Sequence, residues 1–131
     1  DSVQFYVSDD VGLSSVVEKH IEGWKDHCIV EQLEVPVIHI NEIFEMLERE
    51  QGCDLLSIDI EGYDLMALQS LDWEKHRPKI IIAELSWGAA GRRSYYQQIV
   101  DLLIGKGYFL YANNQYNGIF VDEKYKEAKG I

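Results

Sequence analysis

Acidic side chains crowd a glycine in the stretch LLSIDIEGYDLMALQSL, which spans residues 55–71. Asp59, Glu61 and Asp64 surround Gly62 where an apolar run typical of a buried strand changes into a helical pattern. Carboxylates in such a cluster can remove a proton from a substrate, orient its hydroxyl groups or contact a divalent cation. A glycine at this point lets the backbone turn sharply or lets a ligand approach closely.

A further acidic side chain, Glu84, ends the next apolar run, KIIIAEL at residues 79–85. In an open α/β sheet, ligands bind beyond the carboxyl ends of the strands, so Asp59 and Glu84 would share one rim if their strands were neighbours. The loop SWGAAG at 86–91 follows and carries Trp87 close to that rim. A loop that covers a bound substrate has this composition, and so has an ordinary loop.

The alternative for the acidic cluster is structural, because an acidic residue at a helix start caps free backbone amides and complements the helix dipole. One residue is enough for a cap, whereas several carboxylates at one helix start repel one another. Capping alone therefore does not explain Asp59, Glu61 and Asp64 together. For Glu84, the structural alternative is a solvated strand end.

The composition is that of a single globular domain over residues 1–131, with 47% hydrophobic and 27% charged residues. A formal net charge of −11 repels phosphate backbones and anionic membrane surfaces, which argues against nucleic acid and membranes as partners. No apolar run approaches the roughly 20 residues that cross a bilayer. Cys28 and Cys53 lack a CxxC pattern and favour two reduced thiols in a cytoplasmic protein, with a disulfide as the alternative.

The residue periodicity predicts an α/β fold. From residue 41 onward strands alternate with helices, which is typical of a mainly parallel sheet covered on both faces, and a terminal β-hairpin adds an antiparallel strand at one side. Helix caps are predicted at Ser15, Asn41 and Ser94. Strands are expected at 3–8, 31–40, 53–60, 79–85 and within 108–123, and helices at 15–24, 41–51, 62–71 and 94–104. The expected core stripes of the last three helices are Ile40, Ile43, Phe44 and Leu47; Leu65, Leu68 and Leu71; and Tyr96, Ile99, Val100 and Leu103.

Patterns for other chemistries are weak. Gly105-Lys106-Gly107 follows a predicted helix and opens a strand, whereas a dinucleotide fingerprint needs a strand, a loop and a helix in that order. His20 and His27 would lie about 10 Å apart on a continuous helix, too far to share one zinc ion. The histidines therefore predict no metal site.

Four segments resemble, in this order, the C-terminal half of FkbM-type methyltransferases: DLLSIDIEGYDLMALQSL, RPKIIIAEL, YYQQIVDLLIGKGYFLY and NGIFVDE. The upstream EVPVIHINEIFE resembles the segment that precedes the D-x-E-G strand, so the likeness runs from Val35 to Glu123, and residues 1–34 match poorly. The resemblance implies a partial Rossmann-like methyltransferase fold whose first three strands are missing. It also implies a C-terminal fragment that lacks the glycine-rich turn for the cofactor.

The resemblance implies a parent enzyme that uses S-adenosylmethionine to methylate a hydroxyl of a sugar or natural-product acceptor. Asp59, Glu61 and Gly62 fall on the family's D-x-E-G motif, beside cofactor and acceptor. Asp59 is the expected general base or metal contact, and Glu61 its partner or a substrate-orienting group. Gly62, Glu84 and Trp87 are expected to contact the substrate. The resemblance assigns no cofactor-binding residue in this chain, and a divalent metal stays an open alternative to base catalysis.

Two other hypotheses remain. An α/β binding or interaction domain without chemistry would use the acidic rim to recognise a cation or a polyol. Alternatively, another chain supplies the missing strands, and an unpaired sheet edge promotes self-association. The expected partners are a small-molecule or glycan acceptor and a second copy at that edge. Catalysis is expected of the parent protein, and activity of residues 1–131 alone is not predicted.

Overall fold

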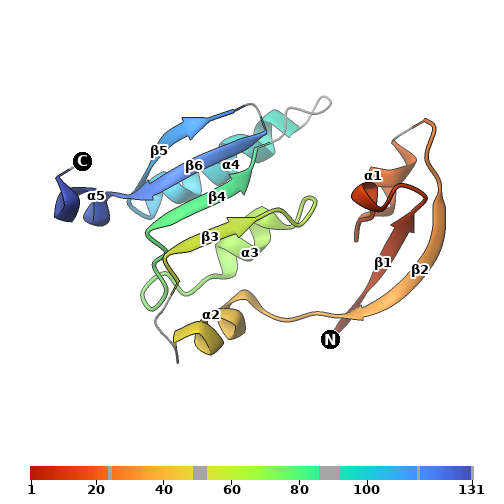
Figure 1. Cartoon of the computed structure of the whole chain (residues 1–131), viewed down its shortest axis with the longest axis horizontal. Coiled ribbons are helices and arrows are strands. Elements are labelled where there is room, and N and C mark those ends of the chain that lie inside the picture. Colours follow the sequence, from red (N-terminus) through yellow and green to blue (C-terminus); the bar gives the residue numbers. More distant parts are fainter. Residues whose placement is uncertain (24, 49–52, 86–91, 115, 131) are drawn as a thin grey trace. The chain divides into compact units, whose positions relative to one another are not determined.

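The computed structural model describes residues 1–23, 25–48, 53–85, 92–114 and 116–130 (Figure 1). The chain divides into two compact units. The first comprises Asp1–His39 with Ile60–Gly62, and the second comprises Ile40–Asp59 with Tyr63–Ile131. Compact units do not by themselves define separate domains, so the single domain expected for residues 1–131 stays a prediction.

The first unit is built on a two-stranded antiparallel ribbon. β1 (Ser2–Ser8) pairs with β2 (Ile29–Pro36), with Phe5 opposite Leu33. The strand predicted at 3–8 is confirmed. The extended stretch predicted at 31–40 is confirmed as a strand only over residues 31–36. Between these strands in sequence lie a 3-10 turn and a short helix, η1 (Val11–Leu13) and α1 (Glu18–Glu22).

The capping box predicted at Ser15 is wrong. α1 follows Val17, whose side chain makes no cap hydrogen bond. Ser15 instead forms an isolated antiparallel bridge with Tyr6, and its Oγ accepts a hydrogen bond from the Val17 amide at 3.0 Å. Ser15 lies two residues before the N-cap position of Val17, and its hydroxyl binds the Val17 amide rather than an amide in the first turn of α1.

Asp9 closes the connection between β1 and β2. Its Oδ1 accepts a hydrogen bond from the Cys28 amide at 3.1 Å and lies 3.2 Å from Nδ1 of His27. The amide hydrogen bond is the main cause of a pKa for Asp9 below the ordinary value. Desolvation opposes this shift, and hydrogen bonds from Ser8 and His27 add to it.

We expect this contact to be lost in acid. Because the folded-state pKa of Asp9 is depressed, its contribution to stability is present above the unfolded value of 3.8 and disappears as the pH falls through the lower folded value. The amide proton shift of Cys28 should therefore titrate with a midpoint below 3.8. In Asp9→Asn the same resonance should not titrate in this range, and an unchanged titration there would show that another group is responsible.

The second unit contains a four-stranded sheet in the order β3 (Leu55–Ile58), β4 (Ile80–Glu84), β6 (Asn117–Asp122), β5 (Tyr108–Asn113). β3 and β4 are parallel, and β6 is antiparallel to both β4 and β5. The α/β class, the parallel pair and the terminal hairpin are confirmed. The hairpin lies at one side of the sheet and supplies the antiparallel strand β6, which inserts between β4 and the edge strand β5.

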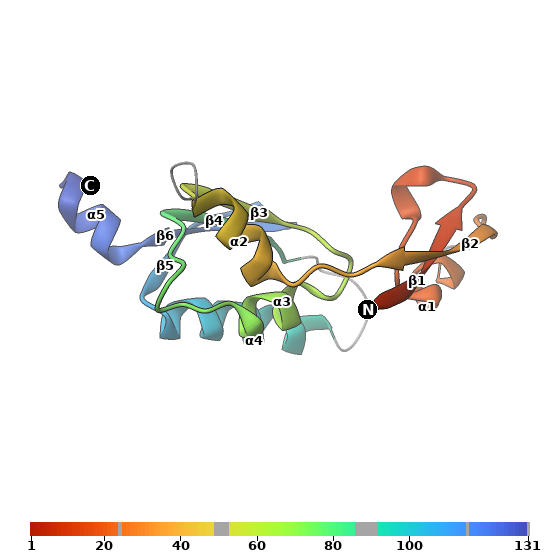
Figure 2. The same ribbon diagram turned by 90° about the horizontal axis from the view of Figure 1, so that it is seen from below.

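Two helices, α3 (Asp64–Ser70) and α4 (Arg92–Gly105), cover one face of this sheet (Figure 2). α4 begins at Arg92, so the cap predicted at Ser94 is wrong. The apolar stripes of both helices are buried at the predicted spacing, by Leu65, Leu68 and Leu71 and by Ile99, Val100 and Leu103. Tyr96, predicted as part of the second stripe, is only partly buried against the same core. They belong to one core with the strand residues Ile58, Ile81, Ala83, Tyr108 and Phe120.

The other face of the sheet keeps an apolar surface that the described helices leave partly exposed. Both crossovers, through α3 and through α4, place their helix on the same side of the sheet. The expected coverage of both faces is therefore wrong for the described residues. We call this surface the open face; strand register assigns to it Leu55, Ser57, Ile80, Ile82, Ile119 and Val121.

The stripe predicted for α2 (Ile40–Glu48) is only partly buried. Phe44 reaches the core with 3% exposure, whereas Ile43 and Leu47 are each 41% exposed. α2 makes its packing contacts with the region that follows α3, where the Phe44 ring lies 5.1 Å from that of His76. A stripe at helical spacing marks an apolar side of a helix, but not whether a neighbouring element covers it.

Asn41 lies inside α2, so its predicted capping role is wrong. Its side chain accepts a hydrogen bond from the Asp72 amide at 2.8 Å and donates one to the Ser70 carbonyl at 3.1 Å. These bonds tie the start of α2 to the end of α3.

Among the described residues, no helix has both the length and the apolar content needed to cross a membrane.

Arg77 fastens the end of the sheet opposite to the carboxyl ends of β3 and β4. Its Nη2 and Nε donate to Oδ1 and Oδ2 of Asp122 at 2.9 and 3.2 Å, and its Nη1 donates to the Lys106 carbonyl at 3.0 Å. Asp122 also caps α5 (Glu123–Lys129) by accepting from the Lys124 amide at 3.0 Å. A bidentate pair of this kind fixes the geometry of this end.

Candidate functional site

The candidate site lies at the carboxyl ends of β3 and β4. These strands are parallel neighbours, with Ile58 opposite Ala83. Asp59 follows Ile58 and Glu84 follows Ala83, so the two acidic residues end adjacent strands at the same level. The sequence analysis expected a shared rim if these two strands were neighbours, and their pairing confirms that they are. The catalytic and binding roles of the two residues stay predictions.

Asn117 extends this line of residues onto a third strand. It begins β6 and is the strand partner of Glu84 across the β4–β6 pair. We call Asp59, Glu84 and Asn117 the carboxyl-end rim. The sequence analysis missed Asn117, because its place at the start of a predicted hairpin strand does not show which strand lies beside it.

The carboxyl-end rim continues into the apolar open face. Glu84 and Asn117 are half-buried, and Asp59 is exposed. Because side chains alternate along a strand, Ile82 and Ile119 lie in the next row on the same face as Glu84 and Asn117. A ligand at the rim would therefore meet oxygen-bearing side chains next to an apolar surface. This arrangement suits a molecule with hydroxyl groups and an apolar part.

The turn after Asp59 holds its backbone in an uncommon conformation. Glu61 has a φ of 52° and Gly62 a φ of 99°, so both are left-handed. Among the described residues, Glu61 is the one non-glycine residue with positive φ. Such a conformation costs a residue with a side chain about 1 kcal/mol. Backbone strain of this kind gathers at functional sites, which supports a role for Glu61 beyond the turn itself.

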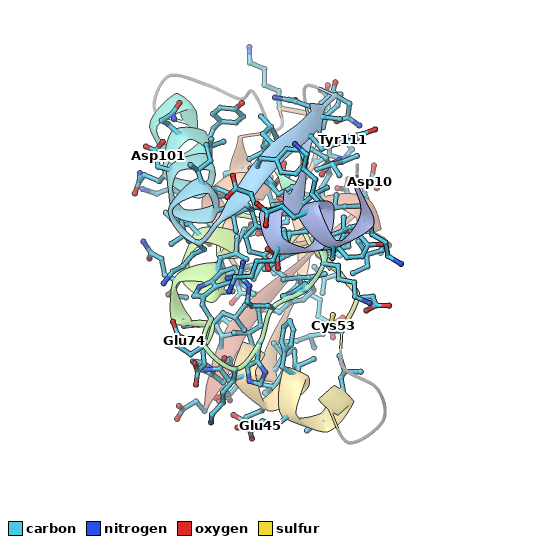
Figure 3. The ribbon with its side chains drawn as sticks, turned by 90° about the vertical axis from the view of Figure 1, so that its left-hand side faces the viewer. Asp10, Glu45, Cys53, Glu74, Asp101 and Tyr111 are labelled. Carbon is cyan, nitrogen blue, oxygen red and sulfur yellow. The ribbon has the colours of Figure 1, made fainter. Side chains whose placement is uncertain are left out.

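We expect Glu61→Gly to keep or raise the stability of the chain. Removal of the strain contributes about 1 kcal/mol to the free energy of unfolding, and the greater freedom of glycine in the unfolded chain offsets part of it. Glu45→Gly is the matched control, because Glu45 is exposed in the interior of α2 (Figure 3). This control should lose about 1 kcal/mol in urea unfolding. An equal loss in both variants would mean that Glu61 is not strained.

The predicted site residues divide between the two units. Ile60–Gly62 group with the first unit and Asp59 and Glu84 with the second, so the roles expected of Glu61 and Gly62 stay predictions. Asp64 is 0% exposed, because it lies one helical turn before Leu68 on the buried side of α3. It therefore does not belong to a surface cluster. Trp87 and its loop, 86–91, lie outside the described residues.

The described residues offer oxygen atoms at the rim but no assembled metal site. Within the described ranges, no group of three or more His, Cys, Asp or Glu side chains could hold a metal ion. Gly105 ends α4, and Gly107 turns the chain towards β5 with a φ of 83°. The predicted role of these glycines as a helix stop is confirmed. They therefore do not supply a strand–loop–helix cradle for a cofactor.

One comparison with known protein families gives a match that includes Asp59 and Glu84. A family model described as the Methyltransferase FkbM domain matches residues 3–110, which is most of the chain. The chain belongs to the FkbM methyltransferase family. The match begins within β1 and ends within β5, so it includes residues before Val35 as well as Asp59 and Glu84. No curated protein and no solved structure matches the chain.

Membership of the FkbM methyltransferase family makes methyl transfer the reaction class and S-adenosylmethionine the general cofactor of such enzymes. The parallel β3–β4 pair, Asp59 after β3 and Glu84 at the end of β4 all lie within the matched residues. Asn117 lies beyond the matched residues, so its place at the rim comes from the β4–β6 register alone.

Proposed function

We propose that this chain is part of an S-adenosylmethionine-dependent O-methyltransferase that methylates a hydroxyl of a sugar or natural-product acceptor. The observation that carries the proposal is the pair Asp59 and Glu84, which end adjacent parallel strands in a chain of the FkbM family. Carboxylates suit this acceptor, because their oxygens receive hydrogen bonds from hydroxyl groups and can take the hydroxyl proton.

Bound S-adenosylmethionine would supply an electrophilic methyl group. The residues of the chain then have two tasks, to hold the acceptor hydroxyl in line and to help remove its proton. Asp59 is the proposed general base, with the proton passing to a carboxylate oxygen, and Glu61 its partner. Glu84, Gly62 and Trp87 are proposed to orient the acceptor. A divalent cation at Asp59 that acidifies the hydroxyl is the alternative to direct base catalysis.

We propose that these residues lie in a Rossmann-like methyltransferase fold. Its support is the β3–α3–β4 crossover, with acidic residues at the carboxyl ends of the strands, followed by an antiparallel hairpin. We also propose a cytoplasmic location, since both Cys28 and Cys53 are free thiols.

Calorimetric titration with S-adenosylhomocysteine tests the cofactor assignment on residues 1–131 and, in parallel, on any longer product of the same gene. Heat of binding with either protein would support the methyltransferase proposal. Transfer of a labelled methyl group to a panel of sugars and polyols, followed by mass spectrometry, then tests the acceptor class. A methylated nitrogen in the product would contradict the O-methyltransferase assignment.

A binding domain without chemistry remains the second candidate, and the exposed carboxylate of Asp59 favours it. Such a domain would bind a polyol or a cation at the rim without S-adenosylhomocysteine. If residues 1–131 and the longer product both bind a sugar, and neither gives heat of binding with S-adenosylhomocysteine, the binding domain becomes the preferred candidate over the enzyme.

A further inference from the structure

Tyr116 is an exposed aromatic residue beside the carboxyl-end rim. It comes directly before Asn117 and is 65% exposed. Its carbonyl accepts a hydrogen bond from the amide of Leu85, the residue that follows Glu84. Large apolar side chains occur singly on many protein surfaces, so exposure alone gives Tyr116 no role. What singles out Tyr116 is its position between two residues of the rim and the turn of the β5–β6 hairpin.

The backbone of this turn is held by the side chain of Asn114. Its Oδ1 accepts hydrogen bonds from the amides of Tyr116 at 3.2 Å and Asn117 at 2.8 Å. The Asn114 amide donates in turn to the Asn117 carbonyl at 3.1 Å. Asparagine often stabilises a turn in this way. The Tyr116 ring is therefore carried by a fixed backbone, and a tyrosine side chain loses little conformational entropy when a ligand binds to it.

A polar pair lies on the same face of the sheet as Tyr116. Asn113 is the strand partner of Gly118, and Tyr116 comes two residues before Gly118, so strand alternation assigns all three to one face. Nδ2 of Asn113 donates a hydrogen bond to the Tyr96 hydroxyl at 3.2 Å, which joins the end of β5 to α4. We call Tyr96, Asn113 and Tyr116 the hairpin corner. An aromatic ring beside a few polar groups suits a sugar ring.

The strand order gives the separation between the hairpin corner and Asp59. β3, β4, β6 and β5 lie side by side in this order (Figure 1). Neighbouring strands are about 4.8 Å apart, so β6 lies about 10 Å and β5 about 14 Å from β3. A single sugar ring is about as wide as one strand spacing. A ring held at Asp59 and Glu84 therefore does not reach the hairpin corner, whereas a second ring linked to the first does.

The composition of the hairpin corner indicates the chemistry of that second unit. An apolar unit would remove water from the amide of Asn113 and the hydroxyl of Tyr96 without replacing its hydrogen bonds. A sugar offers hydroxyl groups to these atoms and an apolar ring face to Tyr116. The hairpin corner therefore favours a second sugar over an apolar extension of the acceptor.

We propose that the acceptor is a glycan of at least two linked sugars, whose second unit stacks on Tyr116 and hydrogen-bonds to Asn113 while the first presents its hydroxyl to Asp59. This inference rests on the proposed function, because it takes Asp59 as the site of the methylated hydroxyl. Tyr116 then determines the length of the acceptor that the protein prefers.

NMR titration of residues 1–131 tests the binding of the second sugar. The probes are the disaccharides cellobiose, maltose and lactose, with methyl glucoside as the single sugar. We expect the amide signals of Asn113, Tyr116 and Asn117 to shift with at least one disaccharide. That disaccharide should bind at least about fivefold more tightly than methyl glucoside, because it alone reaches the hairpin corner. No shift at these residues with any of the three disaccharides would overturn the inference.

Tyr116→Ala is the decisive variant. It should weaken binding of the disaccharide about fivefold or more, to the level of methyl glucoside, and Tyr116→Phe should bind like the original chain because it keeps the ring. Tyr111→Ala is the matched control, since Tyr111 is equally exposed, at 66%, but lies at the irregular register of β5 (Figure 3). Circular dichroism checks that each variant is folded. Equal binding by Tyr116→Ala and the original chain would contradict the stacking on Tyr116.

Initial rates of methyl transfer separate this inference from the proposed function. In whichever form of the protein is active, KM should be lower for the disaccharide than for the single sugar, and Tyr116→Ala should abolish this difference. Methyl transfer with equal KM for both acceptors would overturn the inference and leave the proposed function in place. Binding of a disaccharide at Tyr116 without methyl transfer in any form would instead contradict the proposed function and keep the hairpin corner as a glycan site.

Discussion

Asp59→Asn should lower the rate constant of methyl transfer by about 100- to 1,000-fold, with a smaller effect on KM, in whichever form of the protein is active. The substitution keeps the size and shape of the side chain and removes its ability to take a proton. A general base within hydrogen-bond reach of the acceptor contributes an effect of this order. Asp59 is exposed at the end of β3, so the change should leave the fold intact. The measurement is initial rates at saturating acceptor and cofactor.

Asp101→Asn is the matched control for this prediction. Asp101 is an exposed residue of α4 in the same unit, where its Oδ1 accepts a hydrogen bond from Gln97 at 2.8 Å (Figure 3). An asparagine keeps that acceptor, so activity and stability should match the original chain. Chelation of divalent cations separates the two roles of Asp59. Full activity in the presence of a chelator would leave it as a base, whereas an unchanged rate for Asp59→Asn would remove it from the mechanism.

The elements that the sequence predicted best are those in which neighbouring residues carry the whole signal. α3 and α4 bury their stripes at the expected spacing, because a helix that packs one side against a core shows that side in its own periodicity. Caps were predicted less well. Ser15 and Asn41 have the right side chains, but Ser15 bridges to Tyr6 and Asn41 binds near the end of α3. These partners are distant in sequence and override the local preference.

The residues of the candidate site also differ in whether the sequence could predict them. Asp59 and Glu84 could be predicted to meet, because the carboxyl ends of parallel neighbours lie at one edge of a sheet. Asn117 could not, since only the three-dimensional order places β6 beside β4. The left-handed backbone of Glu61 was also hidden, because glutamate favours other conformations and the adjacent Gly62 accounted for the turn. Strain at a residue that is not glycine becomes visible only in the structure.

Gly118→Ala should be the most destabilising small substitution at the carboxyl ends of the strands. Gly118 lies on β6 between Ala83 and Asn113, and a Cβ at this position would point towards the core. A Cβ there would overlap Leu85 Cδ1 and would lie 2.8 Å from Phe120 Cε2. Both neighbours are buried, at 1% and 0% exposure, so neither can move away without disturbing the core.

Overpacking of this kind should lower the free energy of unfolding by about 2–3 kcal/mol and the Tm by about 5–10 °C. Gly105→Ala is the control, because a Cβ at Gly105 meets nothing within 4 Å. At the end of α4, alanine should be neutral or stabilising by up to about 1 kcal/mol. Urea unfolding followed by tryptophan fluorescence measures both variants, since Trp73 is buried in the same core as Leu85 and Phe120.

Gly118→Ala should also affect the binding of the acceptor. Leu85 follows Glu84, and its amide donates to the Tyr116 carbonyl next to Asn117. If a Cβ at Gly118 pushes Leu85 outward, Glu84 moves relative to Asp59, and productive placement of the acceptor is lost even in molecules that remain folded. We therefore expect an increase in KM for the acceptor at temperatures well below the Tm of the variant. If the variant is destabilised but its KM is unchanged, the overlap at Gly118 is relieved without displacing Glu84. The role of Glu84 in orienting the acceptor would then lose its support.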